Sequence, residues 1–164
     1  MKLTLLIIVS VFIGCLQAFG DASFSKQQTD VAIAYETLLK AKFFSLGGIG
    51  EGGLISSGES AFRVILSSSE AVALFQRVLK SENLPAKIYA LCAFHVIDKK
   101  AYAIAAKKIK AGNPSVPIMT GCIQYSTPAD EILANIEGGK YDDLLKVSEK
   151  KEKGSGNVGL GKQP

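Results

Sequence analysis

The chain has 164 residues, which is enough for one domain of ordinary size and too few for two. Hydrophobic residues make up 48% of the sequence and charged residues 21%, a composition that excludes a wholly disordered protein. The formal net charge of +4 is too small to argue for binding to nucleic acid.

Residues 1–20 have the pattern of a cleavable export signal. Lys2 precedes the apolar run 3–13, which is too short to anchor a chain across a bilayer. Ala18 and Gly20 then place small residues at the positions that signal peptidases recognise. We therefore expect an exported protein, periplasmic or secreted, whose mature chain begins near residue 20.

A second processing route stays open at Cys15. The sequence Phe12-Ile13-Gly14-Cys15 resembles a bacterial lipobox, in which Cys15 would become the lipidated first residue, although such boxes usually begin with Leu. Lipidation would tie the protein to the envelope membrane through that residue alone. The alternative is a cysteine that is lost with the leader.

Cys92 and Cys122 are the two cysteines that either route leaves for the folded domain. Exported proteins meet an oxidising environment, so we expect these two residues to form a disulfide. A bridge that closes a loop of about thirty residues would contribute roughly 3 to 4 kcal/mol to stability. Two buried, reduced thiols are the alternative.

Helical periodicity starts after a polar lead. Apolar residues spaced as on one helix face predict a helix over 29–44, with Thr29 or Asp30 as its N-cap. Ser56-x-x-Glu59 and Ser67-x-x-Glu70 both have the spacing of a capping box, and each predicts the start of another helix.

The next helix should be the centre of the domain. Pro85 suits a first helical turn, and the run 88–97 that follows is apolar nearly all round. Asp98 then predicts the N-cap of a helix over 99–111. Its predicted inward residues are Ala101, Ile104, Ala105 and Ile109.

The last third of the chain mixes structure types. Prolines and β-branched residues predict a small hairpin over 116–125 that turns at Thr120-Gly121. Thr127-Pro128 predicts a final helix through Ile136, followed by a short apolar segment over 141–147. Residues 148–164 are rich in Lys, Glu, Gly and Ser and predict a disordered tail.

These elements predict a mainly all-α fold of about six helices with a minor β-hairpin, in one domain over 21–147. Within 59–111, and above all in the pair 71–79 and 85–97, the succession of short helices resembles the antiparallel helix pairs of HEAT-like repeats. The resemblance implies an architecture, either a HEAT-like stack or a small irregular bundle. It implies no functional residues.

Glycine dominates the segment from Gly47 to Gly58. Residues 48–53 fit the pattern G-x-G-x-x-G with Gly48, Gly50 and Gly53, but a dinucleotide site also needs a preceding strand and a helix that begins at the third glycine. We interpret the segment as a flexible or a partner-binding loop. Leu54 and Ile55 would be its contact residues, because a loop that is only a flexible connection needs no apolar side chains.

Catalytic and metal-binding patterns are weak. His95, the only histidine, lies three residues before Asp98, and Ser67, Ser68 and Ser69 could approach it without any motif that positions a nucleophile. The acidic pairs Asp130-Glu131 and Asp142-Asp143 could act as paired catalytic acids, but adjacent acids on a helix point in different directions. A helix first turn explains Asp130 and Glu131 without catalysis. No cofactor and no metal site is expected.

A basic face is predicted on the helix over 99–111. Its residues are Lys99, Lys100, Lys107, Lys108 and Lys110. Solvation is the simplest interpretation of this face, and contact with an anionic lipid or an acidic partner is the alternative.

These patterns together favour a non-catalytic binding or structural module of the cell envelope. One form of it would be an inhibitor or immunity-type protein that acts on another protein in the periplasm. The alternative is a small exported enzyme that uses His95 or the acidic residues.

Overall fold

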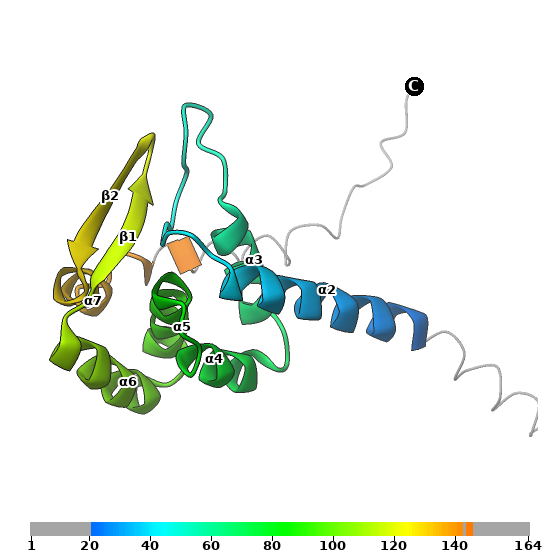
Figure 1. Cartoon of the computed structure of the whole chain (residues 1–164). Helices are drawn as coiled ribbons and strands as arrows, with labels where there is room; N and C mark the ends of the chain where they lie inside the picture. The colour runs from blue at the N-terminus through cyan, green and yellow to red at the C-terminus, as the bar shows by residue number, and fades with distance from the viewer. Residues whose placement is uncertain (1–20, 143, 146–164) are drawn as a thin grey trace, which may run out of the picture.

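The computed structural model describes residues 21–142, 144 and 145. Over this part of the chain there are six helices and one two-stranded antiparallel sheet (Figure 1). They are α2 (Asp21–Leu39), α3 (Ser57–Leu66), α4 (Ala71–Leu79), α5 (Leu84–Ile97), α6 (Lys99–Gly112), β1 (Ser115–Thr120), β2 (Ile123–Pro128) and α7 (Ala129–Glu137). The predicted mainly helical fold with a minor hairpin is confirmed. The predicted leader with Cys15 and the predicted tail lie outside the described residues.

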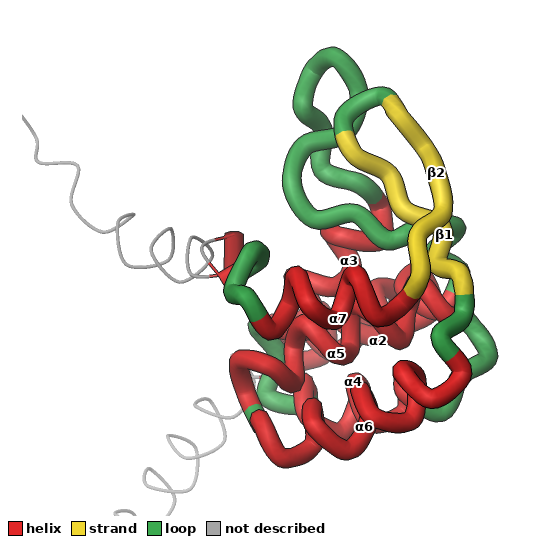
Figure 2. The backbone as a smooth tube through the Cα atoms, turned by 90° about the vertical axis from the view of Figure 1, so that its left-hand side faces the viewer, coloured by secondary structure: helices red, strands yellow, loops and turns green. Residues whose placement is uncertain are grey.

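Helix α5 forms the centre of the molecule, as its apolar sequence predicts. Every residue from Ile88 to Phe94 is at most 1% exposed, and α5 contacts α3, α4, α6, α7 and β1. The Asn83 side chain begins the helix by accepting a hydrogen bond from Ala86 N at 2.9 Å. Helices α3, α4, α6 and α7 pack around α5, and α2 packs against α3 (Figure 2).

A chain of aromatic rings runs through this core. Tyr89 on α5 lies between Phe44, at 4.8 Å between ring centroids, and Phe62 on α3, at 5.4 Å. Phe62 then contacts Phe75 on α4 at 5.6 Å, and Phe75 contacts Phe94 at 6.4 Å. Large rings at such distances fill volume and attract one another through their edges and faces, so they join four segments into one core.

Helix α2 differs from its prediction at both ends. It already includes Asp21, because residues 21–28 contain no Gly or Pro that would stop a helix. Thr29 and Asp30 therefore lie inside the helix and neither is its N-cap. The helix ends at Leu39, earlier than predicted, because Phe44 must reach β1 in an extended conformation.

The two predicted capping boxes have different outcomes. Ser56 is the N-cap of α3, and its hydroxyl accepts from Glu59 N at 3.0 Å, as predicted. The second prediction is wrong, because Ser67 ends α3 and its hydroxyl donates to carbonyls of the last turn of that helix. Helix α4 begins at Ala71, after Glu70, without a side-chain cap. Serine hydroxyls can form hydrogen bonds at either end of a helix, so the Ser-x-x-Glu spacing alone does not show whether a helix begins or ends there.

The prediction for α6 is right at its start and shifted on its buried face. Asp98 caps the helix by accepting from Lys100 N at 3.0 Å. The buried residues are Tyr102 and Ala106, whereas Ile104, predicted to face inward, is 63% exposed. Because Ile104 lies about 200° around the helix from Tyr102, packing the larger ring inward turns the isoleucine outward.

In the hairpin, Thr120 lies opposite Ile123, so the turn residues are Gly121 and Cys122. The turn is one residue later than predicted. Gly121 has a φ of +55°, the left-handed conformation that two-residue hairpin turns require and that glycine adopts without strain.

Candidate functional site

The loop of residues 45–55 and the β1–β2 hairpin rise side by side from the helical body (Figures 1 and 2). We call these two segments together the arm. Parallel bridges join Phe44 to Ile118 and Ile49 to Gly121, so the loop follows the outer side of β1. One edge of the arm is therefore β2, and the other edge is the loop.

Backbone hydrogen bonds hold the loop against the hairpin. Near the body, Phe44 N donates to Pro117 O at 2.8 Å, and Phe44 O accepts from Met119 N at 3.0 Å. Near the tip, Gly50 N donates to Gly121 O at 2.9 Å. The glycine-rich segment thus has a defined course, and it could leave the hairpin only by breaking these bonds.

The glycines serve a tight turn. Ile49 and Leu54 exchange two backbone hydrogen bonds of 2.8 Å, which close the loop around residues 50–53. Gly50 and Gly53 have φ values of +69° and +61°, and a Cβ on Gly48 would lie 2.7 Å from the Cα of Gly53. This turn accounts for the G-x-G-x-x-G spacing. The segment follows helix α2 instead of the strand that a dinucleotide site requires.

Buried hydroxyl groups join the base of the arm to α5. The Tyr89 hydroxyl donates to Ser45 O at 2.7 Å and accepts from Ser45 N at 3.1 Å, and Ser45 Oγ donates to Ser56 Oγ at 2.8 Å. Burial raises the pKa of Tyr89, so the phenol stays protonated and remains a donor. A Cβ on Gly58 would lie 3.1 Å from the Tyr89 hydroxyl, so the helix start is fitted closely to the ring.

A buried carboxylate completes this base. Glu59 is 1% exposed, and its Oε2 accepts from Gly47 N at 2.9 Å. Its Oε1 accepts from Arg63 Nη2 at 2.7 Å and from Arg63 Nε at 3.0 Å. Arg63 Nη1 also donates to Leu144 O at 3.2 Å. The capping-box spacing singles out Glu59 in the sequence, but nothing in that spacing indicates that the carboxylate holds the loop.

Four large exposed apolar side chains lie on the arm, and others are spread over the helices of the body. Leu54 is 71% exposed, Ile55 58%, Ile123 67% and Tyr125 46%. The first two are the residues predicted to make the contacts of a partner-binding loop, and both face water. The polar groups at the base bond to one another, so the exposed part of the arm offers apolar surface and backbone edges, which suit binding more than acid–base chemistry.

His95 meets a different carboxylate from the one expected. Its Nδ1 lies 3.6 Å from Asp142 Oδ1, and its ring contacts Tyr102 at 5.2 Å between centroids. Asp98 caps α6 instead. The hydroxyls of Ser67 and Ser68, two of the candidate nucleophiles, donate to backbone carbonyls of α3. His95 thus contacts α6 through Tyr102 and the segment that follows α7 through Asp142.

The expected disulfide is not formed in this structure, where both thiols are free. Cys92 is buried within α5, whereas Cys122 is exposed at the hairpin turn. A disulfide needs Cα atoms within about 7 Å, which residues at the centre of the body and at the tip of the arm do not meet. Burial raises the pKa of the Cys92 thiol, so this residue is an unreactive part of the core.

The acidic pairs are explained by local bonds. Asp130 Oδ1 accepts from Glu131 N at 2.8 Å, and Glu131 Oε2 accepts from the Thr127 hydroxyl at 2.6 Å. Asp142 pairs with His95 as described, and Asp143 lies outside the described residues. Asp130 and Glu131 lie in the first turn of α7, whereas Asp142 follows that helix.

The five lysines of the basic face are all exposed. Lys107 and Lys110 border a groove of about 450 Å³ beside Tyr102 and Glu137. The Tyr102 hydroxyl donates to Glu137 Oε1 at 3.3 Å, so a carboxylate already lies at this place. That carboxylate would oppose binding of an anion, which favours simple solvation of the lysines.

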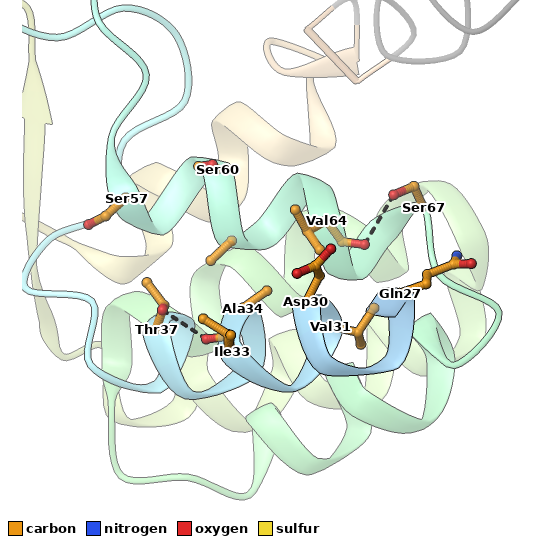
Figure 3. A pocket seen from close by; sticks show the side chains of 11 residues that line it. Gln27, Asp30, Val31, Ile33, Ala34, Thr37, Ser57, Ser60, Val64 and Ser67 are labelled. Atoms are coloured by element: carbon orange, nitrogen blue, oxygen red, sulfur yellow. Dashed lines mark hydrogen bonds between the residues drawn. The ribbon is translucent and has the colours of Figure 1, made fainter. Parts of the chain in front are cut away.

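A second groove, of about 490 Å³, lies between α2 and α3 (Figure 3). Val31, Ala34 and Ala61 contribute its apolar surface, and Asp30 is its charged residue. The hydroxyls of Thr37 and Ser67 donate to carbonyls of their own helices, as the dashed lines in Figure 3 show. The further polar residues of its lining, Gln27 on α2 and Ser57 and Ser60 on α3, come from both helices.

Among the described residues, no cluster of three or more His, Cys, Asp or Glu side chains could hold a metal ion. Within the same part of the chain, no helix has the length and apolar character needed to cross a membrane. No protein-family model, no curated protein and no solved structure gives a significant match to this sequence.

Proposed function

We propose that this protein is an exported, non-catalytic binding module that contacts another protein through the loop edge of its arm. One observation carries the proposal: Leu54 and Ile55 are 71% and 58% exposed on a segment whose backbone is hydrogen-bonded in place. Apolar side chains on a braced projection favour burial against a partner, because removing their surface from water is favourable.

The bracing itself supports a binding role. Ordering a loop on association costs conformational entropy, and a loop that is already fixed avoids most of this cost. The bonds of Glu59 to Gly47 and of Ser45 to Tyr89 fix the loop at its base, and the bridges to the hairpin fix it at its tip. A narrow, fixed projection would suit insertion into a cleft, as in an inhibitor or immunity-type protein.

The alternative of an enzyme has one supporting observation, the pair of His95 and Asp142. A hydrolytic site would also need a nucleophile beside the histidine and donors for a developing negative charge. The nearby thiol of Cys92 is fully buried, and its pKa is raised. We therefore favour the binding role over catalysis.

Variants at the loop test the proposal. Leu54→Ser together with Ile55→Ser should leave the melting temperature unchanged, because both side chains are exposed, and should abolish capture of the partner from an envelope extract of the source organism. Val96→Ser together with Ile104→Ser is the matched control, since these residues are 54% and 63% exposed on the helical body.

Capture is measured with each variant immobilised at equal density and the bound proteins identified by mass spectrometry. Loss of a bound protein with the loop variant alone supports the proposal. Equal capture by both variants, with both folded, would contradict it. A large loss of stability in the loop variant would show that these two residues belong to the core.

A further inference from the structure

Strand β2 has one edge that pairs with β1 and one edge that faces away from the molecule. Thr120 and Ile123 flank a two-residue turn, and in such a turn the flanking pair is hydrogen-bonded. Hydrogen-bonded and non-hydrogen-bonded pairs alternate along an antiparallel ladder, so the N–H and C=O groups of Tyr125, two residues further on, also point towards β1. The N–H of Met119 points the other way, to Phe44, as this alternation requires. It follows that the backbone groups of Gln124 and Ser126 point outward, on the side away from the loop (Figure 1).

Among the described residues, this outer edge has none of the usual protection against strand pairing. Proteins commonly shield an open edge with lysines, prolines, bulges or a covering segment. Residues 115–128 contain no charged side chain, and the proline of β2, Pro128, is its last residue. Ile123 and Tyr125 are 67% and 46% exposed along the same strand.

We propose that β2 pairs with β2 of a second copy of this chain, antiparallel, about a two-fold axis at Tyr125. In this register Gln124 of each copy lies opposite Ser126 of the other, and the two residues exchange their N–H and C=O groups. Every outward backbone group of these two residues then has a partner. Tyr125 faces its own copy in a pair without backbone bonds, where opposing side chains come closest.

A second copy suits this edge for reasons of charge and chemistry. Symmetric pairing places β2 against an identical strand, so charges of one sign on β2 would face one another, and β2 has no charged residue. The exposed tyrosine and isoleucine would both lose solvent-accessible surface in the pair. The result is a four-stranded sheet with the two Leu54–Ile55 loops at its outer edges, which leaves the loop edge free for the partner of the proposed function.

The pairing should be weak. Two strands of six residues bury less surface than the roughly 1,200 Å² of a standard stable interface, so we expect a reversible monomer–dimer equilibrium between about 10 µM and 1 mM. Sedimentation equilibrium of the folded chain over this range measures the dissociation constant. A protein that stays monomeric to the highest concentration would overturn the proposal.

Ser126→Pro removes the outward N–H, and its ring blocks the approaching strand. The N–H of Ser126 is not used for pairing with β1, so the hairpin should tolerate the change, and dimerisation should weaken by about a hundredfold. Ser126→Ala keeps the backbone N–H and should dimerise as the unchanged chain does. Equal dissociation constants for the two variants would contradict pairing through this edge.

Charge exchange identifies a second copy of the chain as the occupant of this edge. A chain with Gln124→Lys and Ser126→Lys should be monomeric, and so should a chain with Gln124→Glu and Ser126→Glu, because each would oppose like charges. A mixture of the two should associate at least as tightly as the unchanged chain. If the mixture stays monomeric although both chains show unchanged circular dichroism, this pairing is wrong, whatever the outcome of the capture experiment.

Discussion

In the helical body, the side chains from Ile88 to Phe94 of α5 are hidden on every side, whereas the arm turns four large apolar side chains towards water. The body derives its stability from packed side chains, among them the row of aromatic rings around Tyr89. The arm derives its shape from backbone hydrogen bonds and from glycines in left-handed conformations. The two regions therefore differ in role. Substitutions in the body should lower stability, whereas the arm exposes apolar surface that a partner can contact. The predictions that follow test this separation, starting with the body.

Truncation of the core should have the largest effect. Phe62 is fully buried and contacts the rings of Phe75 and Tyr89, so Phe62→Ala should lower the free energy of unfolding by about 3 to 5 kcal/mol. Leu54→Ala removes a side chain that is 71% exposed and should change it by less than about 0.5 kcal/mol. Chemical denaturation of both variants makes the measurement. Similar losses would mean that the arm is part of the core.

The junction between body and arm should show an intermediate effect. Glu59→Gln keeps an acceptor for Gly47 N but leaves Arg63 without its anionic partner, so we expect a loss of about 2 to 3 kcal/mol. Hydrogen exchange at the amides of Ile49 and Leu54 should accelerate as well, because the loop loses its hold at the base. The exposed Glu51→Gln is the matched control and should change neither quantity.

The tip of the arm should show the smallest effect. With both thiols free, Cys122→Ala should change stability by less than about 0.5 kcal/mol, whereas loss of the bridge expected from the sequence would cost a few kcal/mol. In the folded protein, a maleimide should label Cys122 within minutes and Cys92 only after unfolding, since Cys92 is 1% exposed. If neither thiol reacts before the protein is reduced, the disulfide expected from the sequence is present after all.

Sequence patterns predict the body better than the arm, for a physical reason. The all-round apolar run 88–97 and the Asp98 cap are local signals. The structure confirms the cap and the burial of residues 88–94, whereas Val96 and Ile97 at the end of the run are 54% and 41% exposed. The boundaries of α2 and the buried face of α6 depend on what packs against them, such as Phe44 and Tyr102, and local spacing does not contain that information. The HEAT-like arrangement of α4 and α5 stays a prediction.

Within the candidate site, the sequence identifies the apolar loop residues but not what holds them. The glycine density and the pair Leu54-Ile55 are visible as letters, and their exposure agrees with the prediction. The contact of Tyr89 with Ser45 joins residues 44 positions apart, and the contact of Arg63 with Leu144 joins residues 81 positions apart. Such pairs arise only from the tertiary fold. The open edge of β2 likewise follows from the loop occupying the other side of β1.

The close fit between Gly58 and Tyr89 constrains how this protein can evolve. A methyl group at position 58 would press on the phenol ring, and removing the hydroxyl at position 89 would leave the polar groups of Ser45 and Ser56 without their shared partner. A substitution at either position alone should therefore be unfavourable. In divergent homologues that retain the arm, we expect glycine and tyrosine to be kept together or to be replaced together, and lineages with only one of the two should have lost the loop as well.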